Sequence, residues 1–187
     1  FIGKAAADDR RVSMAAASHG LVLQHHFAIT VLTEKLLHGS AAALLRPLYE
    51  ACVNGLWLTY LADEQNLDAF EANRSPPDPS KVLRKLRSRI DAESVAFLER
   101  LHAQAIDALN SYVHTGGLQV MRHIGPTMIG PNFSQVEIAE CLEFANLVFI
   151  TSALELRTLL DVQCDQAIEE VLCRYKPEQF QDKTPTA

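Results

Sequence analysis

No stretch of the sequence is apolar for long enough to cross a membrane. A membrane-spanning helix needs about 18 uninterrupted apolar residues. The longest apolar stretches are interrupted by Arg46, Glu50, Asn54 or Glu155. The sequence also begins FIGKAAADDRR, which has neither the basic start nor the apolar core of a signal peptide. These features predict a cytoplasmic protein that has no membrane partner.

Paired cysteines and the common ligand-binding motifs are also missing. The four cysteines are Cys52, Cys141, Cys164 and Cys173, and none belongs to a C-x-x-C pair. This pattern argues against a zinc ribbon or a thioredoxin-like redox pair, and it favours reduced cysteines in the core of a cytosolic protein. There is no G-x-S-x-G, Walker or G-x-G-x-x-G motif, so hydrolase, P-loop and dinucleotide-binding functions lack support. We expect no cofactor.

A metal site is not expected either. Glu99 and His102 form one E-x-x-H motif, which is half of what a di-iron helical bundle uses, and the sequence contains no second pair. His19 and His26 share one face of the first predicted helix, but no acidic residue or cysteine accompanies them at ligand spacing. We therefore interpret both motif residues and both histidines of the first helix as ordinary helix residues.

The residues that are present predict helices almost throughout. Apolar residues recur at steps of three and four over residues 8–38, 41–62, 80–114 and 134–175, and no stretch alternates as a strand does. With 187 residues, 48% of them hydrophobic, the chain is long enough to bury one core. The predicted fold class is all-α: a single antiparallel bundle of four to five long helices over residues 1–176, with a loose tail over 177–187.

Glycine, proline and capping residues set the expected helix ends. Gly39 is expected in a left-handed position between the first two helices, and Pro47 should bend the second. The Pro-rich stretch EANRSPPDPS separates two helical hairpins. The third helix is expected to bend near Asp91 and to stop at Gly116. Ser134 begins an S-x-x-E capping box that opens the last helix.

Two polar pairs stand out because each lies in an otherwise apolar helix. Arg46 and Glu50 are one turn apart in ALLRPLYEACVNGLWL, and Asn110 and His114 are one turn apart in LNSYVHTGG. A buried arginine needs a partner, and Glu50 is placed to provide one. If the two hairpins pack together, both pairs face one site beside the Gly-rich loop. Such a site is a candidate catalytic pocket.

A purely structural role explains the same four residues. Arg46 and Glu50 can form an internal ion pair that fixes the register of their helix. His114 can hydrogen-bond the last carbonyls of its own helix, which is common for a histidine near a helix C-terminus. Both interpretations are open at the level of the sequence.

Positive charge is concentrated in one segment of an acidic chain. KVLRKLRSR, residues 81–89, contains five of the 17 basic residues, while the whole chain has 23 acidic residues and a net charge of −6. The overall charge argues against broad nonspecific binding of nucleic acid. Lys81, Arg84 and Lys85 can nevertheless share a helix face that contacts phosphates, and Arg122 is a further candidate. The alternative is a solvated helix surface opposite an apolar face.

Together the motifs resemble those of a known family. Gly39-Ser40-Ala41, then LLRPLYEACVNGLWL, and then LNSYVHTGG resemble HEPN-like domains of bacteria and, more narrowly, the uncharacterised bacterial families related to them. The resemblance covers the segment from about His25 to Pro131, and the last helix agrees in kind. It implies a bundle of four to five helices that often forms a homodimer. Many relatives are metal-independent ribonucleases of toxin–antitoxin or phage-defence systems.

In active members of that family, an Arg followed about four to six residues later by a His cleaves RNA at the dimer cleft. His114 matches this His by its position near the end of the third long helix. Asn110 stands where the Arg is expected, and an amide brings no positive charge to stabilise a phosphorane. Arg46 from the neighbouring helix, or Arg122 and His123 from the loop, would have to supply that charge.

The sequence therefore supports two functional hypotheses. The first is a HEPN-like component of defence or toxin–antitoxin biology with weak or lost metal-independent endoribonuclease activity. Its catalytic residues would be His114, Asn110, Arg46 and Glu50, and its partners a second copy of the chain, RNA or an antitoxin. The second is a noncatalytic interaction bundle or small-ligand-binding bundle in which the same polar network is structural.

Overall fold

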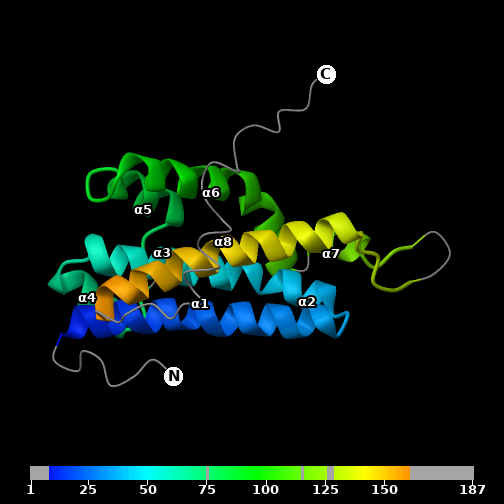
Figure 1. Cartoon of the computed structure of the whole chain (residues 1–187), viewed down its shortest axis with the longest axis horizontal. Coiled ribbons are helices and arrows are strands. Elements are labelled where there is room, and N and C mark those ends of the chain that lie inside the picture. Colours follow the sequence, from blue (N-terminus) through cyan, green and yellow to red (C-terminus); the bar gives the residue numbers. More distant parts are fainter. Residues whose placement is uncertain (1–8, 75, 115, 126–128, 161–187) are drawn as a thin grey trace.

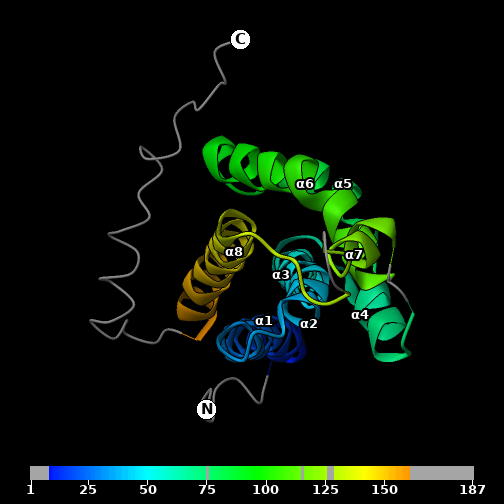
Figure 2. The same ribbon diagram turned by 90° about the vertical axis from the view of Figure 1, so that its right-hand side faces the viewer.

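The helices over residues 10–34, 45–60 and 135–160 run roughly along the longest dimension of the protein (Figure 1), whereas the helix over residues 92–113 lies obliquely across them (Figure 2). The structure is a computed structural model that describes residues 9–74, 76–114, 116–125 and 129–160. The long helices are α1 (Arg10–Glu34), α3 (Leu45–Tyr60), α6 (Ala92–Val113) and α8 (Gln135–Leu160). The short helices are α2 (His38–Ala43), α4 (Glu64–Glu71), α5 (Pro79–Leu86) and α7 (Gly117–Met121). Apart from one isolated bridge, Ile124 to Ile129, the regular secondary structure of the described residues is all helical, and the all-α prediction is confirmed.

Helix α3 is the centre of the bundle. It packs most extensively against α1 and also against α5, α6 and α8, and Figure 2 shows it enclosed by α1, α6 and α8. Ten of its 16 residues are buried, so it is apolar on nearly every side, as a helix must be when neighbours surround it. Among the described helices, none is both long enough and apolar enough to cross a bilayer.

The joint between α1 and α2 differs from the prediction. The left-handed residue is Leu36, with φ of 60°, whereas Gly39 lies inside α2. The Leu37 amide donates to the Leu32 carbonyl at 2.8 Å, and the Leu36 amide donates to the Thr33 carbonyl at 3.0 Å. These two bonds form the Schellman motif that ends many helices. The prediction that Gly39 is the left-handed residue of this joint is therefore wrong.

Gly39 serves a different purpose from the one expected. A Cβ added at this residue would lie 3.0 Å from Cε1 of His123, which follows α7. The Gln119 side-chain amide of α7 also donates to the Gly39 carbonyl at 3.2 Å. The glycine thus allows α7 to approach α2 closely, and this is a tertiary requirement that the local sequence does not reveal.

Replacing Leu36 by glycine should stabilise the protein by about 1 kcal/mol, because leucine is strained at positive φ and glycine is not. Leu36 is 68% exposed, so little apolar burial is lost. Urea unfolding of the two proteins measures the difference. The matched control is Asn73→Gly, since Asn73 has φ of 57° and asparagine already tolerates this conformation. A loss of stability in the Leu36 variant would show that leucine is not strained at this position.

The second and third predicted helices are each interrupted near the residue where the sequence predicts a bend. The chain breaks between α2 and α3 at Leu44, which leaves Pro47 in the first turn of α3, where its missing N–H is harmless. Helix α5 ends at Leu86, and α6 begins after Asp91, whose carboxylate accepts the Ser94 amide at 2.8 Å. Each expected bend is therefore a junction between two helices.

The last long helix begins as the sequence predicts. The Ser134 hydroxyl accepts the Glu137 amide at 3.2 Å, and the Glu137 carboxylate accepts the Ser134 amide at 2.9 Å. This reciprocal pair is the predicted capping box. The expected continuation of the helix to Tyr175 and the expected loose tail lie outside the described residues, as do Cys164 and Cys173.

A small polar cluster is buried where α1, α3 and α8 meet. His19 is fully buried, and its Nδ1 lies 3.1 Å from the Ser152 hydroxyl of α8. A Cβ added at Gly55 of α3 would lie only 2.5 Å from Nε2 of His19. Burial raises the pKa of the neighbouring Cys52 thiol to about 12, so this thiol stays protonated. The close packing of α1 on α3 depends on the absent side chain of Gly55.

Candidate functional site

Helices α6 and α8 border a seam whose floor is α3. Helix α6 packs on α2, α3, α5 and α7, whereas α8 packs on α1 and α3. Figure 2 shows α6 and α8 on different sides of α3. Two hollows of about 580 and 410 Å³ lie along this seam, and Leu147 of α8 lines both.

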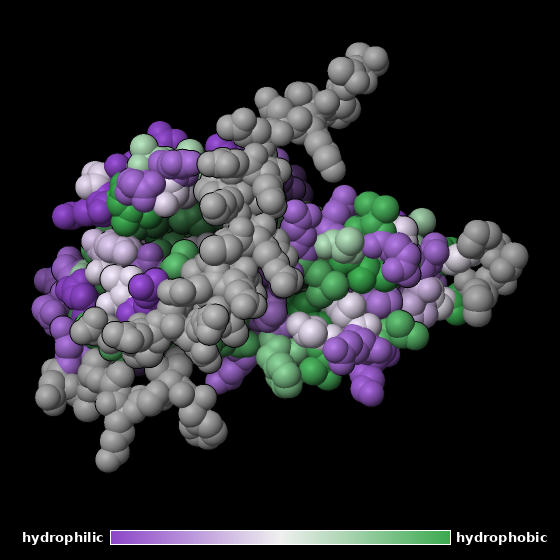
Figure 3. All heavy atoms as spheres, viewed as in Figure 1, coloured by the Kyte–Doolittle hydropathy of each residue, from purple (hydrophilic) through white to green (hydrophobic). Residues whose placement is uncertain are grey.

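The smaller hollow has the character of a ligand site, and we call it the Glu155 cavity. Its walls come from α3, α6 and α8 and are mainly apolar: Leu56, Phe97, Leu98, Leu147, Ile150 and Leu154. Figure 3 shows a hollow with apolar walls between α6 and the helices beneath it. Small-molecule sites are typically concave and apolar with a few placed polar groups, at volumes of about 300–1,000 Å³.

One hydrogen-bonded pair supplies the polar part of this cavity. The Tyr60 hydroxyl of α3 donates to the Glu155 carboxylate of α8 at 2.9 Å. Burial raises the pKa of Glu155 above its ordinary value, and the Tyr60 hydrogen bond opposes that rise. Burial and the nearby Glu155 charge raise the pKa of Tyr60 to about 12, so Tyr60 remains the proton donor. A perturbed carboxyl group in an apolar cavity is a frequent mark of function.

The remaining charged residues of the Glu155 cavity are mostly acidic. Asp91 and Glu93, at the start of α6, and Arg100, two turns further on, line it together with Ser94 and Thr151. Asp91, Glu93 and Arg100 are exposed at the surface of the chain. With Glu155, the lining therefore holds three carboxylates and one cation, and it favours a positively charged ligand.

The larger hollow, between the C-terminal half of α6 and the start of α8, is organised differently. Arg122 forms an ion pair with Glu137 of the capping box, and both line this hollow with Tyr112 and Cys141. Burial raises the pKa of the Cys141 thiol to about 11, so Cys141 is a neutral thiol here and not a nucleophile. Arg122, predicted to bind nucleic acid, is engaged by a carboxylate of its own chain.

Arg46 and Glu50 form the ion pair that the sequence predicts, but the pair is not buried. Arg46 Nε lies 2.8 Å from Glu50 Oε1, and the two side chains are 23% and 41% exposed. A partly exposed pair at this helical spacing contributes only about 0.3–0.5 kcal/mol. The expectation of a buried Arg46 that depends on Glu50 is therefore wrong.

Asn110 and His114 lie at the end of α6. The His114 backbone amide donates to the Asn110 carbonyl at 3.2 Å, and His114 is exposed. Over the described residues, no hydrogen bond or ion pair joins this turn to Arg46 or Glu50. The structure thus joins the two residues of each pair. Among the described residues, neither a hydrogen bond nor an ion pair connects one pair to the other.

The predicted phosphate-binding residues lie together on the surface. Lys81, Arg84 and Lys85 are exposed on α5, opposite its buried residues Val82 and Leu83. This is the amphipathic arrangement that the sequence predicts.

The two residues of the E-x-x-H motif, Glu99 and His102, contact side chains that are not metal ligands of a shared site. Arg87 donates to Glu99 from Nε and from Nη2, at 2.9 and 2.7 Å. The Tyr49 hydroxyl lies 3.0 Å from Nδ1 of His102. In the part of the chain that the structure describes, no group of three or more potential metal ligands comes together.

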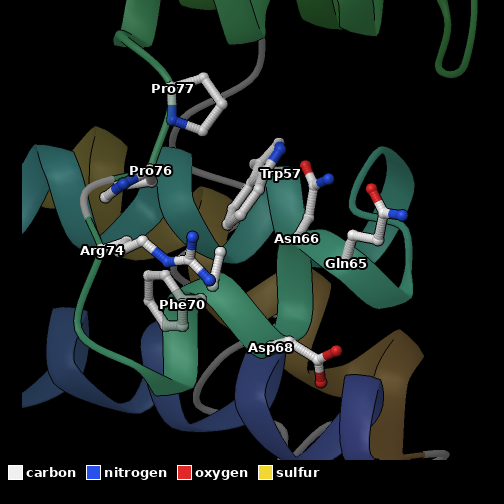
Figure 4. Close-up of a pocket in the computed structure, with 9 residues that line it drawn as sticks. Trp57, Gln65, Asn66, Asp68, Phe70, Arg74, Pro76 and Pro77 are labelled. Carbon is white, nitrogen blue, oxygen red and sulfur yellow. The ribbon is translucent and has the colours of Figure 1, made fainter.

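A further hollow of about 610 Å³ lies beside α4 (Figure 4). Figure 4 shows Arg74 reaching toward Trp57 and Phe70, whose ring centroids are 5.8 Å apart. Gln65 and Asp68 on its wall are exposed, while Trp57 is only 5% exposed. Because the indole ring is covered and the wall is solvated, this hollow offers a ligand little apolar surface.

The comparisons with known proteins place the chain in a family. A family model described as a family of unknown function, DUF6988, matches residues 19–183. The chain belongs to DUF6988. The match begins at the buried His19 and includes every described helix from the middle of α1 to α8, and therefore all residues of the Glu155 cavity.

No curated protein and no solved structure matches this DUF6988 chain. The family description assigns no activity. The resemblance to HEPN-like domains thus stays a prediction from the short motifs of the sequence.

The residues that define the Glu155 cavity were not singled out as site residues from the sequence. Glu155 lies between Leu154 and Leu156 in an apolar part of this DUF6988 chain, and a carboxylate in such a run was the available signal. Tyr60 is 95 residues away along the chain, and no local pattern links the two. The sequence predicts an ordinary helix residue at His19, and the structure buries this residue fully.

Proposed function

We propose that the protein is a noncatalytic binding protein whose Glu155 cavity takes a small hydrophobic amine. The observation that supports this most strongly is the position of Glu155. Its carboxylate lines a cavity of about 410 Å³ with mainly hydrocarbon walls, and its described hydrogen-bond partner is Tyr60. An ammonium group beside Glu155 would provide the opposite charge that a desolvated carboxylate otherwise lacks.

The apolar lining supports a hydrocarbon body behind that ammonium group. Leu56 and Phe97 belong to α3 and α6, and Leu154 belongs to α8, so the hydrocarbon surface surrounds the polar pair on three helices. Burying an apolar ligand surface against such walls contributes about 25 cal/mol for each Å² removed from water. The charged end would provide specificity and the apolar end much of the affinity.

The balance of charge supports an amine over an acid or a neutral molecule. Asp91 and Glu93 add to the negative potential of Glu155, and Arg100 is the single cation of the lining. A carboxylic acid ligand would meet like charges, which disfavour its binding. A neutral alcohol would leave the Glu155 charge uncompensated.

The ribonuclease hypothesis receives less support from the geometry. Metal-free cleavage of RNA needs a group that moves a proton and a cation that stabilises the phosphorane. His114 is exposed at the end of α6, and Arg46 is paired with Glu50. A HEPN-like bundle of four to five long helices, a homodimer, and RNA or antitoxin partners therefore stay predictions from the resemblance.

The test is calorimetric titration of hexylamine, hexanol and hexanoate into the wild-type protein and into Glu155→Gln. Wild type should prefer hexylamine, and Glu155→Gln should weaken hexylamine binding by about tenfold or more, because it removes one charge-assisted contact. Glutamine keeps the size of the side chain and can still accept the Tyr60 hydrogen bond, so hexanol binding should be unchanged.

The matched control is Glu143→Gln, which removes the same charge from an exposed residue of α8 that lines the other hollow. This variant should bind hexylamine as the wild type does. Equal binding of amine and alcohol, or equal weakening by both substitutions, would refute a specific role of Glu155. Cleavage of RNA by the wild type in chelator, lost in His114→Ala, would instead favour the ribonuclease hypothesis.

A further inference from the structure

A concave surface beside the end of α5 is lined mostly by cations. The hollow is about 410 Å³ in volume, and its lining residues are Leu61, Arg84, Lys85, Arg87, Ser88 and Arg89. We call this surface the α5 cradle. It lies outside the Glu155 cavity and shares no lining residue with it.

The fold explains why these cations converge. Val82, Leu83 and Leu86 of α5 are buried, so Arg84 and Lys85 must lie on the opposite face of a helix of only two turns. The chain then turns between Leu86 and the start of α6, and this turn brings Arg87 and Arg89 to the same hollow. Five basic residues in sequence thus become a curved surface with four cations around it.

The charge of the cradle is largely uncompensated. Arg87 is held by Glu99 through two hydrogen bonds, at 2.9 and 2.7 Å. Over the described residues, no carboxylate forms an ion pair with Arg84, Lys85 or Arg89. The nearest acidic residue in the chain is Asp91, which caps α6 by accepting the Ser94 amide. Within the described part of the chain, three cations without an ion-pair partner therefore surround a single hollow.

We propose that the α5 cradle binds a compact polyphosphate: inorganic triphosphate, or the phosphate chain of a nucleotide. Arginine presents paired donors that match phosphate oxygens, and lysine adds a mobile point charge. One phosphate group can engage one or two of these side chains, whereas a chain of phosphates can satisfy all three. The alternative is that the cations only complement the carbonyl end of α5 and are otherwise solvated.

The test is calorimetric titration of sodium triphosphate, without divalent cations, into the wild-type protein and the double variant Arg84→Gln/Arg89→Gln. All substituted side chains are exposed, so the fold is retained, and circular dichroism checks this. The matched control is Lys35→Gln/Arg157→Gln, which removes the same charge from exposed residues outside the cradle. ATP and a single-stranded RNA are titrated in parallel.

The proposal predicts saturable binding of triphosphate that weakens by about tenfold or more in the cradle variant. The control variant should keep its affinity within about twofold, the scale of a nonspecific charge effect. Equal affinities for triphosphate and ATP would identify the phosphate chain as the ligand, and tighter binding of ATP would identify a nucleotide. Equal weakening in both double variants, no saturation, or RNA affinity that grows with length and exceeds that of triphosphate would overturn the proposal.

Discussion

Replacing Gly55 by alanine should destabilise the protein by about 2–4 kcal/mol. The new Cβ would lie 2.5, 2.6 and 2.7 Å from three ring atoms of His19, all far inside van der Waals contact. His19 is fully buried, so its ring cannot move into solvent, and moving it breaks the hydrogen bond to Ser152. Alanine is the better helix former by about 1 kcal/mol, but overpacking and the lost hydrogen bond outweigh that gain. Urea unfolding measures the difference.

Two further variants separate this clash from other effects of alanine. Gly117→Ala is the matched control, because nothing lies within 4 Å of a Cβ added there, and its stability should change by no more than about 0.5 kcal/mol. In a His19→Ala background the space beside Gly55 is empty, so the Gly55 substitution should become nearly neutral there. An equal effect with and without the imidazole would contradict the contact between α1 and α3.

Lowering the pH from 6.5 to 4 should remove about 3 kcal/mol of stability through His19 alone. Burial lowers the pKa of His19 from 6.5 to about 4. Above pH 6.5 the imidazole is neutral in both the folded and the unfolded chain. Between pH 6.5 and 4 the unfolded chain binds a proton that the folded protein does not, so stability falls. Below pH 4 both states are protonated and the loss levels off.

The effect is isolated by comparing wild type with His19→Gln over this pH range. Glutamine does not titrate and can still reach the Ser152 hydroxyl, so the difference between the two unfolding free energies should depend on pH as described. Burial also lowers the pKa of His25 and raises that of Glu155, but both groups are common to the two proteins and cancel. Parallel pH profiles would show that His19 gains a proton readily in the folded state.

The features predicted correctly from the sequence are those with local causes. The capping box at Ser134, the break near Asp91 and the break at Leu44, three residues before Pro47, each depend on residues within about one helical turn. The pairing of Arg46 with Glu50 follows from the same rule, because residues four apart share a helix face.

The features that were missed depend on which helices become neighbours. Helical spacing places Arg46 and Asn110 on faces of their own helices, but it does not determine which helix each face meets. Gly39 resembles a helix terminator, yet its role comes from His123, which follows α7. The Tyr60–Glu155 pair likewise joins α3 to α8 across the cavity. Predicting such contacts requires the relative rotation of two helices, which apolar spacing does not specify.

The incomplete packing between α6 and α8 is what gives the bundle its candidate ligand site. The core forms around α3, whose neighbours include α1, α5, α6 and α8, so stability does not require α6 and α8 to touch. The seam between them can therefore remain open and carry a carboxylate that close packing would exclude.

The most direct test of the account is a carbon-13 NMR titration of the Glu155 side-chain carboxyl, with and without hexylamine. Without the amine, the pKa should lie above the ordinary glutamate value of about 4.3, because the carboxyl is buried. With the amine at saturation it should fall, since a bound ammonium group favours the charged carboxylate. A Glu155 pKa that stays the same at every amine concentration would contradict binding at this carboxyl group.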